Sequence, residues 1–108
     1  MRDTVSNVFA ALADPTRRAI YDELLTYPIG RTATELSSSS EVSRQAIVKH
    51  LQVLTRSGLA DARREGREVR YLATTDGTAP ASTWMADRST AWDRRVAALE
   101  HQIRAKKP

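Results

Sequence analysis

The sequence contains no cysteine, and only four glycines and four prolines occur among its 108 residues. Without cysteine the chain has no disulfide, thiolate metal site, iron–sulfur cluster or thiol nucleophile. The low glycine and proline content excludes collagen-like and low-complexity proteins. No run approaches the roughly 20 apolar residues that a membrane helix needs, and the first residues lack the apolar segment of a secretory signal. We therefore expect a soluble, cytoplasmic protein with no membrane partner.

The composition is that of an ordinary globular protein with an excess of positive charge. Hydrophobic residues make up 41% and charged residues 28%, and the length fits one domain spanning residues 1–108. So small a domain buries a modest core, and such domains often gain burial from a second copy. The net charge is +4, and 14 of the 17 basic residues are arginine. Because arginine makes forked contacts to phosphate and guanine, this composition favours nucleic acid as the partner.

The first part of the chain has the apolar spacing of two consecutive helices. A helix is predicted over about residues 4–13. Its apolar stripe consists of Val5, Val8, Phe9 and Leu12. Asp14 and Pro15 are preferred at a helix start, so a second helix is predicted from Pro15 to about Thr26. We expect this helix to bury Ala19, Ile20, Leu24 and Tyr27.

Two further helices follow, separated by a short turn. Thr32 and Glu35 have the spacing of a capping box, which predicts a helix start. The four serines at 37–40 end that helix, because serine hydroxyls bond their own backbone and favour turns. Ser43 is the next natural cap and opens a helix to about residue 57, where Gly58 provides a left-handed stop.

The rest of the chain changes pattern from helix to strand and back. Two short runs, residues 59–64 and 67–74, flank Glu65-Gly66 and predict a β-hairpin with an arginine-rich tip. A loop containing Pro80 leads to a last helix over about residues 82–106. Its apolar stripe consists of Trp84, Trp92, Val96, Leu99 and Ile103. The expected fold is mainly α with a small β-hairpin, in the order of a winged helix-turn-helix.

In that fold the second helix of the pair enters the major groove of DNA, and the hairpin lies against the flanking backbone. The net charge of residues 42–72 is +4, from seven basic and three acidic residues, which is the charge expected for phosphate binding. The candidate DNA-binding residues are Ser43, Arg44, Gln45, Val48, Lys49, His50, Gln52, Arg56, Arg63, Arg64, Arg67 and Arg70.

The same residues also allow interpretations that involve no DNA binding. The polar side of the helix from Ser43 could be a solvated surface, and His50 could border the core. Glu65 and Glu68 could pair with the hairpin arginines, which would then only keep the hairpin soluble. In that case the chain would be a winged-helix module that binds another protein rather than DNA.

Three segments resemble the ArsR/SmtB family of winged helix-turn-helix repressors. The string at 11–20 (ALADPTRRAI) is similar to the family's opening signature, and the string at 42–54 (VSRQAIVKHLQVL) to its recognition helix. Residues 58–59, 63–67 and 69–71 are similar to its wing. The resemblance covers about residues 5–74. It implies a homodimeric transcriptional regulator, usually a repressor, that dimerises through its first and last helices.

The apolar stripes of the first and last helices agree with that implication. The last helix carries more apolar surface than so small a core can readily cover, although it could instead fold onto its own domain. The candidate dimer-interface residues are Val5, Val8, Phe9, Leu12, Trp84, Trp92, Val96, Leu99 and Ile103.

Many members of the family sense metals through cysteine pairs near the recognition helix or through aspartate and histidine on the last helix. This chain departs from both patterns, because it has no cysteine and only two histidines, His50 and His101. Zinc needs three or four nitrogen, oxygen or sulfur ligands. We therefore expect no metal and no cofactor, and the sequence does not identify an effector.

The sequence also lacks a glycine-rich phosphate loop and a nucleophile motif, so we expect no enzymatic activity.

Overall fold

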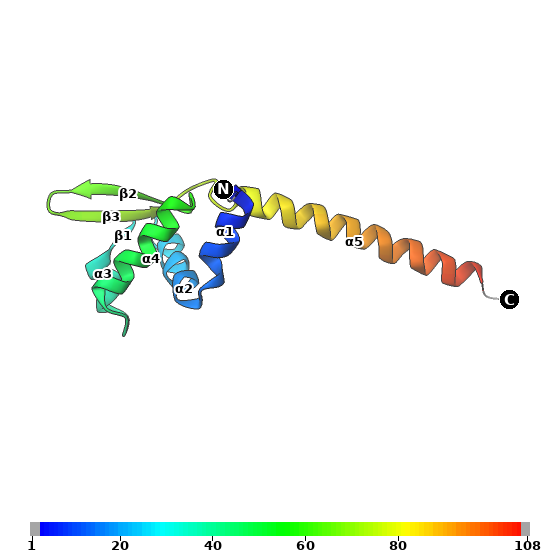
Figure 1. Ribbon diagram of the computed structural model, residues 1–108, viewed down its shortest axis with the longest axis horizontal. Coiled ribbons are helices and arrows are strands. Elements are labelled where there is room, and N and C mark those ends of the chain that lie inside the picture. The colour runs from blue at the N-terminus through cyan, green and yellow to red at the C-terminus, as the bar shows by residue number, and fades with distance from the viewer. Residues whose placement is uncertain (1–2, 107–108) are drawn as a thin grey trace.

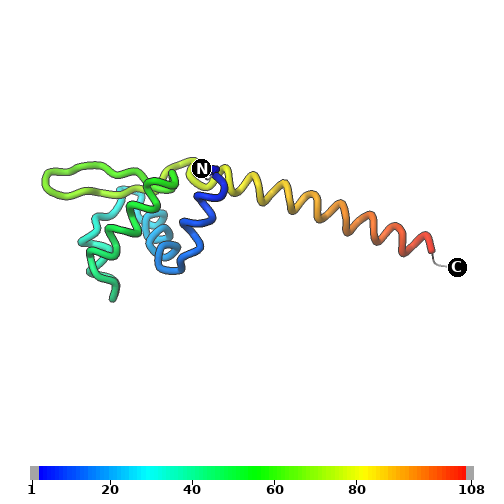
Figure 2. Tube along the Cα trace, in the orientation of Figure 1, coloured from blue at the N-terminus to red at the C-terminus, as the bar shows by residue number. Residues whose placement is uncertain are grey.

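The computed structural model describes residues 3–106, which form five helices and a small sheet. Helices α1 to α4 and the sheet make up a body, and α5 extends away from it (Figure 1). The molecule measures 74 × 28 × 26 Å, and its long axis is set by α5, as the trace in Figure 2 shows. The elements are α1 (Thr4–Ala13), α2 (Pro15–Thr26), β1 (Arg31–Thr32), α3 (Ala33–Ser38), α4 (Arg44–Arg56), β2 (Ala60–Glu65), β3 (Glu68–Ala73) and α5 (Ala79–Ala105).

The predicted starts of three helices are confirmed. The Asp14 carboxylate accepts hydrogen bonds from the backbone N–H groups of Thr16 and Arg17, at 2.8 and 3.1 Å. The N–H group of Arg17 is the main reason that the pKa of Asp14 lies below its usual range. Thr32 and Glu35 form the complete capping box of α3, and the Ser43 hydroxyl caps α4. These caps satisfy backbone donors that would otherwise lack partners at the helix ends.

The hairpin belongs to a three-stranded antiparallel sheet with the order β1-β3-β2. The sequence did not predict β1, because two residues are too short to show an alternating pattern. The predicted turn was also wrong by one residue. Glu65 pairs with Glu68, so Gly66 and Arg67 make the turn, and Gly66 supplies its positive φ of 61°. This two-residue connection matches the preferred geometry of a tight hairpin.

The core lies where α4 meets α2, α3 and the base of the sheet. Within α2, the buried residues are Ile20, Tyr21 and Leu24. The prediction for Ala19 and Tyr27 was wrong. Ala19 is exposed, and Tyr27 follows the helix end in an extended conformation, where the Arg31 guanidinium covers its ring at 4.3 Å.

Helix α5 starts earlier than the sequence predicted and touches the body only near its first turns. Pro80 occupies the first turn instead of a loop, a position that proline tolerates because its missing N–H is not needed there. The Phe9 and Trp84 rings meet edge to face, with their centroids 5.7 Å apart. Of the α5 side chains only Ala81 is buried. No helix within residues 3–106 combines the length and apolar character needed to cross a membrane.

Two glycines with nearly the same backbone conformation give a test of the packing around β3. Gly30 and Gly58 have φ values of 87° and 84°. A Cβ at Gly30 would lie 2.6 Å from the Tyr71 carbonyl oxygen, whereas a Cβ at Gly58 would meet no atom within 4 Å. We expect Gly58→Ala to cost roughly 1–2 kcal/mol for the left-handed backbone alone. Gly30→Ala should cost about 2 kcal/mol more, because overpacking adds to the same strain. Chemical denaturation of both variants measures the difference, and equal costs would contradict this packing.

Candidate nucleic-acid interface

Helix α4 separates a buried apolar side from an exposed polar side. Ile47, Leu51 and Leu54 are each at most 1% exposed. The opposite side of the helix carries four exposed polar residues, Gln45, Lys49, Gln52 and Arg56. They lie four, three and four residues apart, a spacing that follows the helical period and places them on one side. Ser43 and Arg44 are also exposed, at the start of the helix. Together they offer amide and cationic donors of the kinds that contact base edges and phosphates.

Two candidate residues of α4 lie away from this exposed side, and their DNA contacts stay predictions. Val48 is half-buried and packs against the core. His50 is half-buried on the side toward α1 and α2, where its Nδ1 lies 3.3 Å from an Arg17 guanidinium nitrogen. Arg17 also donates to the carbonyl of Ala11 at 2.7 Å, so it joins the end of α1 to α4. The two side chains therefore support the helix rather than forming its exposed surface.

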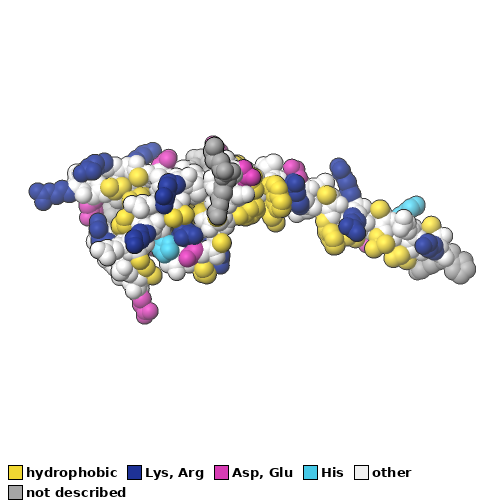
Figure 3. Space-filling view, in the orientation of Figure 1, with side chains coloured by type: hydrophobic (Ala, Val, Ile, Leu, Met, Phe, Trp, Pro, Cys, Tyr) yellow, Lys and Arg dark blue, Asp and Glu magenta, His cyan; other side chains and the backbone are white. Residues whose placement is uncertain are grey.

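A small cavity of about 210 Å³ lies between α3, α4 and the hairpin. Arg44 and Arg67 both line it. Arg44 Nε donates to the Thr34 hydroxyl at 3.2 Å, which holds the start of α4 against α3. The front face of the molecule shows basic side chains over both the hairpin and α4 (Figure 3). The exposed side of α4 and the hairpin thus share one cationic surface.

The four hairpin arginines divide into two groups. Arg63, Arg64 and Arg67 are exposed and take part in none of the ion pairs found within residues 3–106. In the strand register Arg64 pairs with Val69, on the same face as Tyr71, which packs against the core. Alternate residues of a strand point to opposite faces. Arg63 pairs with Arg70 and therefore lies on the other face of the hairpin.

Arg70 is the second group, because it is bonded within its own chain, and its DNA contact stays a prediction. Its guanidinium donates to the carboxylates of Glu65 and Glu35 and, at 3.1 Å, to the Gly30 carbonyl. The hydrogen bond to Glu65 is the main reason that the pKa of Arg70 is raised. Part of the alternative interpretation of the hairpin therefore holds, because Glu65 does neutralise one arginine. Arg70 joins the hairpin to the start of α3.

An ion-pair chain that the sequence did not predict continues from Glu35 to α2. Arg31 lies 3.9 Å from Glu35 and 3.6 Å from Glu23. The chain therefore runs Glu23–Arg31–Glu35–Arg70–Glu65, from α2 through α3 to the hairpin. The Thr32 backbone N–H is the main cause of the lowered pKa of Glu35, to which both arginines add. In the sequence, only the spacing of four residues between Arg31 and Glu35 indicated an ion pair. The Arg70–Glu35 pair gave no such signal, because the two residues lie far apart along the chain.

Most of the apolar side chains predicted at a dimer interface form a strip on α1 and α5 that is exposed or half-buried. Figure 3 shows hydrophobic side chains gathered where the two helices meet and along one edge of α5. The exposed fractions are 40% for Phe9, 40% for Trp84, 63% for Trp92, 57% for Leu99 and 54% for Ile103. Val5 and Val96 are half-buried.

Three residues of this strip differ from the prediction. Val8 is fully buried in the core of its own chain, so it has no surface left for a partner. Leu12 is half-buried and packs against the same core. Met85, which the sequence analysis missed, is 50% exposed and lies seven residues before Trp92, on the same side of α5. That spacing was the signal that could have identified it.

No group of three or more histidine, cysteine, aspartate or glutamate side chains that could hold a metal ion occurs within residues 3–106. His101 is exposed near the end of α5. The cationic surface of α4 and the hairpin, and the apolar strip, are therefore the two surfaces with distinct chemistry.

The role of Arg70 can be separated from that of its neighbour Arg67. Arg70→Ala removes hydrogen bonds to two carboxylates and one carbonyl, so we expect amide hydrogen exchange in β2 and β3 to become about tenfold faster. Arg67→Ala removes a guanidinium that has no ion pair with any residue from 3 to 106, and it should leave this exchange unchanged. Equal exchange in the two variants would show that Arg70 does not hold the hairpin in place.

Comparisons with known proteins place this arrangement in a family. Residues 12–63 match a helix-turn-helix domain family. The transcriptional repressor SdpR of Bacillus subtilis is 31% identical over 81 residues, which cover 75% of this chain and 88% of that protein. A probable mercury resistance operon repressor of Streptomyces lividans is 36% identical over 69 residues, or 64% of this chain, and the match spans only about half (54%) of that repressor.

Solved structures agree over nearly the whole chain. An ArsR-like transcriptional regulator from Rhodococcus sp. RHA1 has a TM-score of 0.77 and 38% identity, with 91% of each chain covered. A homodimeric winged helix-turn-helix DNA-binding domain from Mycobacterium bovis, a possible ArsR-family regulator, has a TM-score of 0.65 and 26% identity, with 81% of this chain and 80% of that chain covered. The chain therefore belongs to the ArsR family of winged helix-turn-helix, DNA-binding transcriptional regulators.

Proposed function

We propose that this chain is a homodimeric repressor that binds a pseudo-palindromic DNA operator. The observation that carries the proposal is the polar and cationic side of α4, which lies beside three hairpin arginines that have no ion pair within residues 3–106. The names of two relatives, both repressors, support repression over activation.

In this proposal, α4 and the hairpin have different tasks on the DNA. Gln45 and Lys49 lie in the first half of α4, the part that approaches base edges in helix-turn-helix proteins. Their amide and ammonium groups suit adenine and guanine edges in the major groove. Arg64 and Arg67 extend from the hairpin, where they contact the flanking phosphates. Phosphate contacts of this kind give affinity without sequence preference.

The second copy packs on the apolar strip of α1 and α5. Met85, Trp92 and Leu99 recur every seven residues, and Val96 and Ile103 share the same interval. A seven-residue repeat is typical of two helices that pack side by side. The homodimeric Mycobacterium bovis domain, which has the same fold, supports this assembly. A two-fold axis would then present two α4 helices about one DNA turn, roughly 34 Å, apart.

The DNA contacts are tested by two substitutions with opposite signatures. Gln45→Ala should relax the sequence preference at one operator position and weaken operator binding by about 1–3 kcal/mol. Arg64→Ala should weaken binding to all sequences about equally and reduce the salt slope by about one unit for the lost phosphate contact. Fluorescence anisotropy on operator and scrambled duplexes over a range of salt concentrations measures both effects.

The same assay separates DNA binding from the alternative of a protein-interaction module. DNA binding that neutralises several phosphates weakens steeply as the salt concentration rises. If the unmodified chain showed no affinity for DNA upstream of its own gene even at low salt, the repressor proposal would be wrong. A change of base preference in Arg64→Ala but not in Gln45→Ala would reverse the assigned tasks.

The dimer is tested by placing a charge in the apolar strip. Leu99→Glu would bury two unpaired carboxylates near the two-fold axis, which is costly, so the dimer should dissociate at micromolar concentration. Operator affinity should fall with it, although no DNA-contacting residue has changed. Ala98→Glu is the matched control, because it adds the same charge on another side of α5. Analytical ultracentrifugation measures the result, and a monomeric wild-type chain that bound an inverted repeat tightly would exclude this interface.

A further inference from the structure

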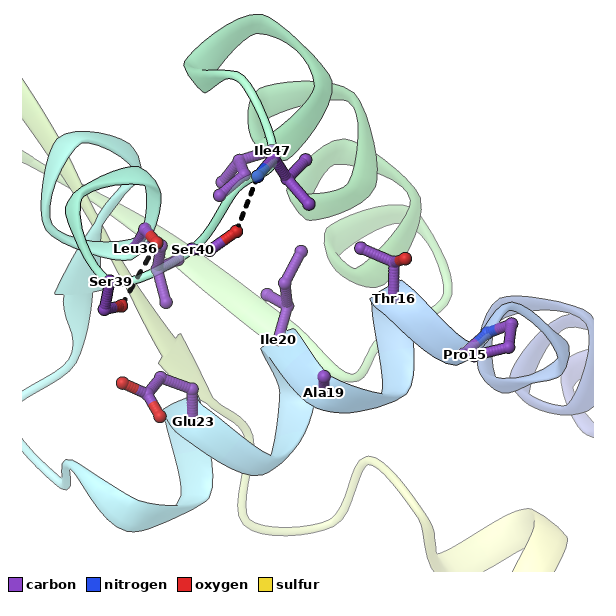
Figure 4. Close-up of a pocket in the computed structure, with 10 residues that line it drawn as sticks. Pro15, Thr16, Ala19, Ile20, Glu23, Leu36, Ser39, Ser40 and Ile47 are labelled. Atoms are coloured by element: carbon purple, nitrogen blue, oxygen red, sulfur yellow. Dashed lines mark hydrogen bonds between the residues drawn. The ribbon is translucent and has the colours of Figure 1, made fainter.

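A crevice of about 390 Å³ lies between α2, α3, the turn that follows α3, and α4. Figure 4 shows Ile20 pointing from α2 into its centre, below the turn and Ile47. Ile20, Leu36 and Ile47 are at most 6% exposed, and they form an apolar floor together with Val42. A crevice of this volume with apolar walls and a few polar groups is typical of small-molecule sites.

The polar side chains that line the crevice are those of Thr16, Glu23, Ser39 and Ser40, and Glu23 is the charged one. Figure 4 shows Glu23 and Ser39 on the same side of the crevice. The Ser39 hydroxyl donates its proton to the Leu36 carbonyl at 3.2 Å, so only its lone pairs are left for a ligand. The Glu23 carboxylate is an acceptor when ionised. The crevice therefore suits a ligand that joins an apolar body to a positively charged donor.

The Glu23 carboxylate is open to a further partner. Its ion-pair contact is the Arg31 guanidinium at 3.6 Å, beyond hydrogen-bond distance, and its side chain is 34% exposed, so a ligand in the crevice can reach it. The Nε of Arg31 is buried and lacks a hydrogen-bond partner within residues 3–106. An ammonium group in the crevice could therefore pair with Glu23 in competition with the long contact from Arg31.

We propose that this crevice binds a small organic cation, a primary ammonium on a short apolar body, as a regulatory ligand. The ammonium pairs with Glu23 and Ser39, and the apolar body contacts Ile20 and Ile47. Because Glu23 is the first member of the ion-pair chain to Arg70, binding releases Arg31 from Glu23 and changes the contacts that hold the hairpin. Any effect on operator affinity rests on the proposed repressor function.

The test uses nuclear magnetic resonance titrations of the full chain with three probes of similar shape: 2-phenylethylammonium, 2-phenylethanol and 3-phenylpropionate. We expect saturating shifts of the Ile20 and Ile47 methyl groups, with the ammonium binding about fivefold tighter than the alcohol and the carboxylate weakest. The Nε–Hε signals of Arg31 and Arg70 should shift with the ammonium alone. Shifts spread evenly over the surface, or equal affinity for all three probes, would overturn the proposal.

Two variants and a control locate the site. Ala19 is exposed and lines the crevice, so Ala19→Phe should fill it without disturbing the core and abolish binding of the ammonium and the alcohol. Thr26→Phe places the same ring on an exposed part of α2 that does not line the crevice, and it should bind like the wild type. Glu23→Gln should keep the alcohol affinity and lose the preference for the ammonium. If Ala19→Phe still bound the ammonium, the site would lie elsewhere.

A DNA-binding measurement distinguishes failure of this proposal from failure of the proposed repressor function. The titrations contain no DNA, so a wild-type chain that fails to bind DNA would contradict the repressor function and leave the crevice result intact. Where the operator is bound, 2-phenylethylammonium should change its affinity about fivefold in the wild type and not in Ala19→Phe. An equal change in both proteins would overturn the regulatory part of the proposal.

Discussion

The orientation of the polar side of α4 depends on the burial of its opposite side. Ile47, Leu51 and Leu54 pack into the core that α2, α3 and the base of the sheet surround. Full burial of a leucine or isoleucine side chain contributes about 1.5–3 kcal/mol. Because the helical period is fixed, burying these three side chains turns Gln45 and Lys49 outward. The orientation of the polar side is therefore a consequence of the core.

The parts of the fold that depend on local chemistry could be predicted from the sequence. The caps at Asp14, Thr32 and Ser43 use residues within three positions of one another, and all three are confirmed. The observed bounds of α2 agree with the predicted ones, because local residues also determine where this helix starts and ends. The hairpin turn was displaced by one residue, because Gly66 fits a tight turn in either register and only the pairing with β3 decides between them.

The site was less predictable, because the roles of charged residues depend on contacts distant in sequence. Arg64 and Arg70 look alike in the sequence, yet Arg70 reaches Glu35 and Gly30 on other elements. His50 and Val48 lie within the recognition segment, but the neighbouring helix and hairpin cover their sides of α4. In this hairpin the fold thus uses Arg70 for its own assembly, whereas Arg63, Arg64 and Arg67 are exposed.

The length of α5 has a consequence for the life of the chain. Its 27 residues extend for about 40 Å away from the body, and only Ala81 among them is buried within residues 3–106. A helix without tertiary contacts is marginal in water, so in an unpaired protomer its far half frays and offers cleavable backbone to proteases. In the proposed dimer, association orders that segment and shields it. The order of this segment then rises with the concentration of the chain, because mass action sets the share of paired protomers.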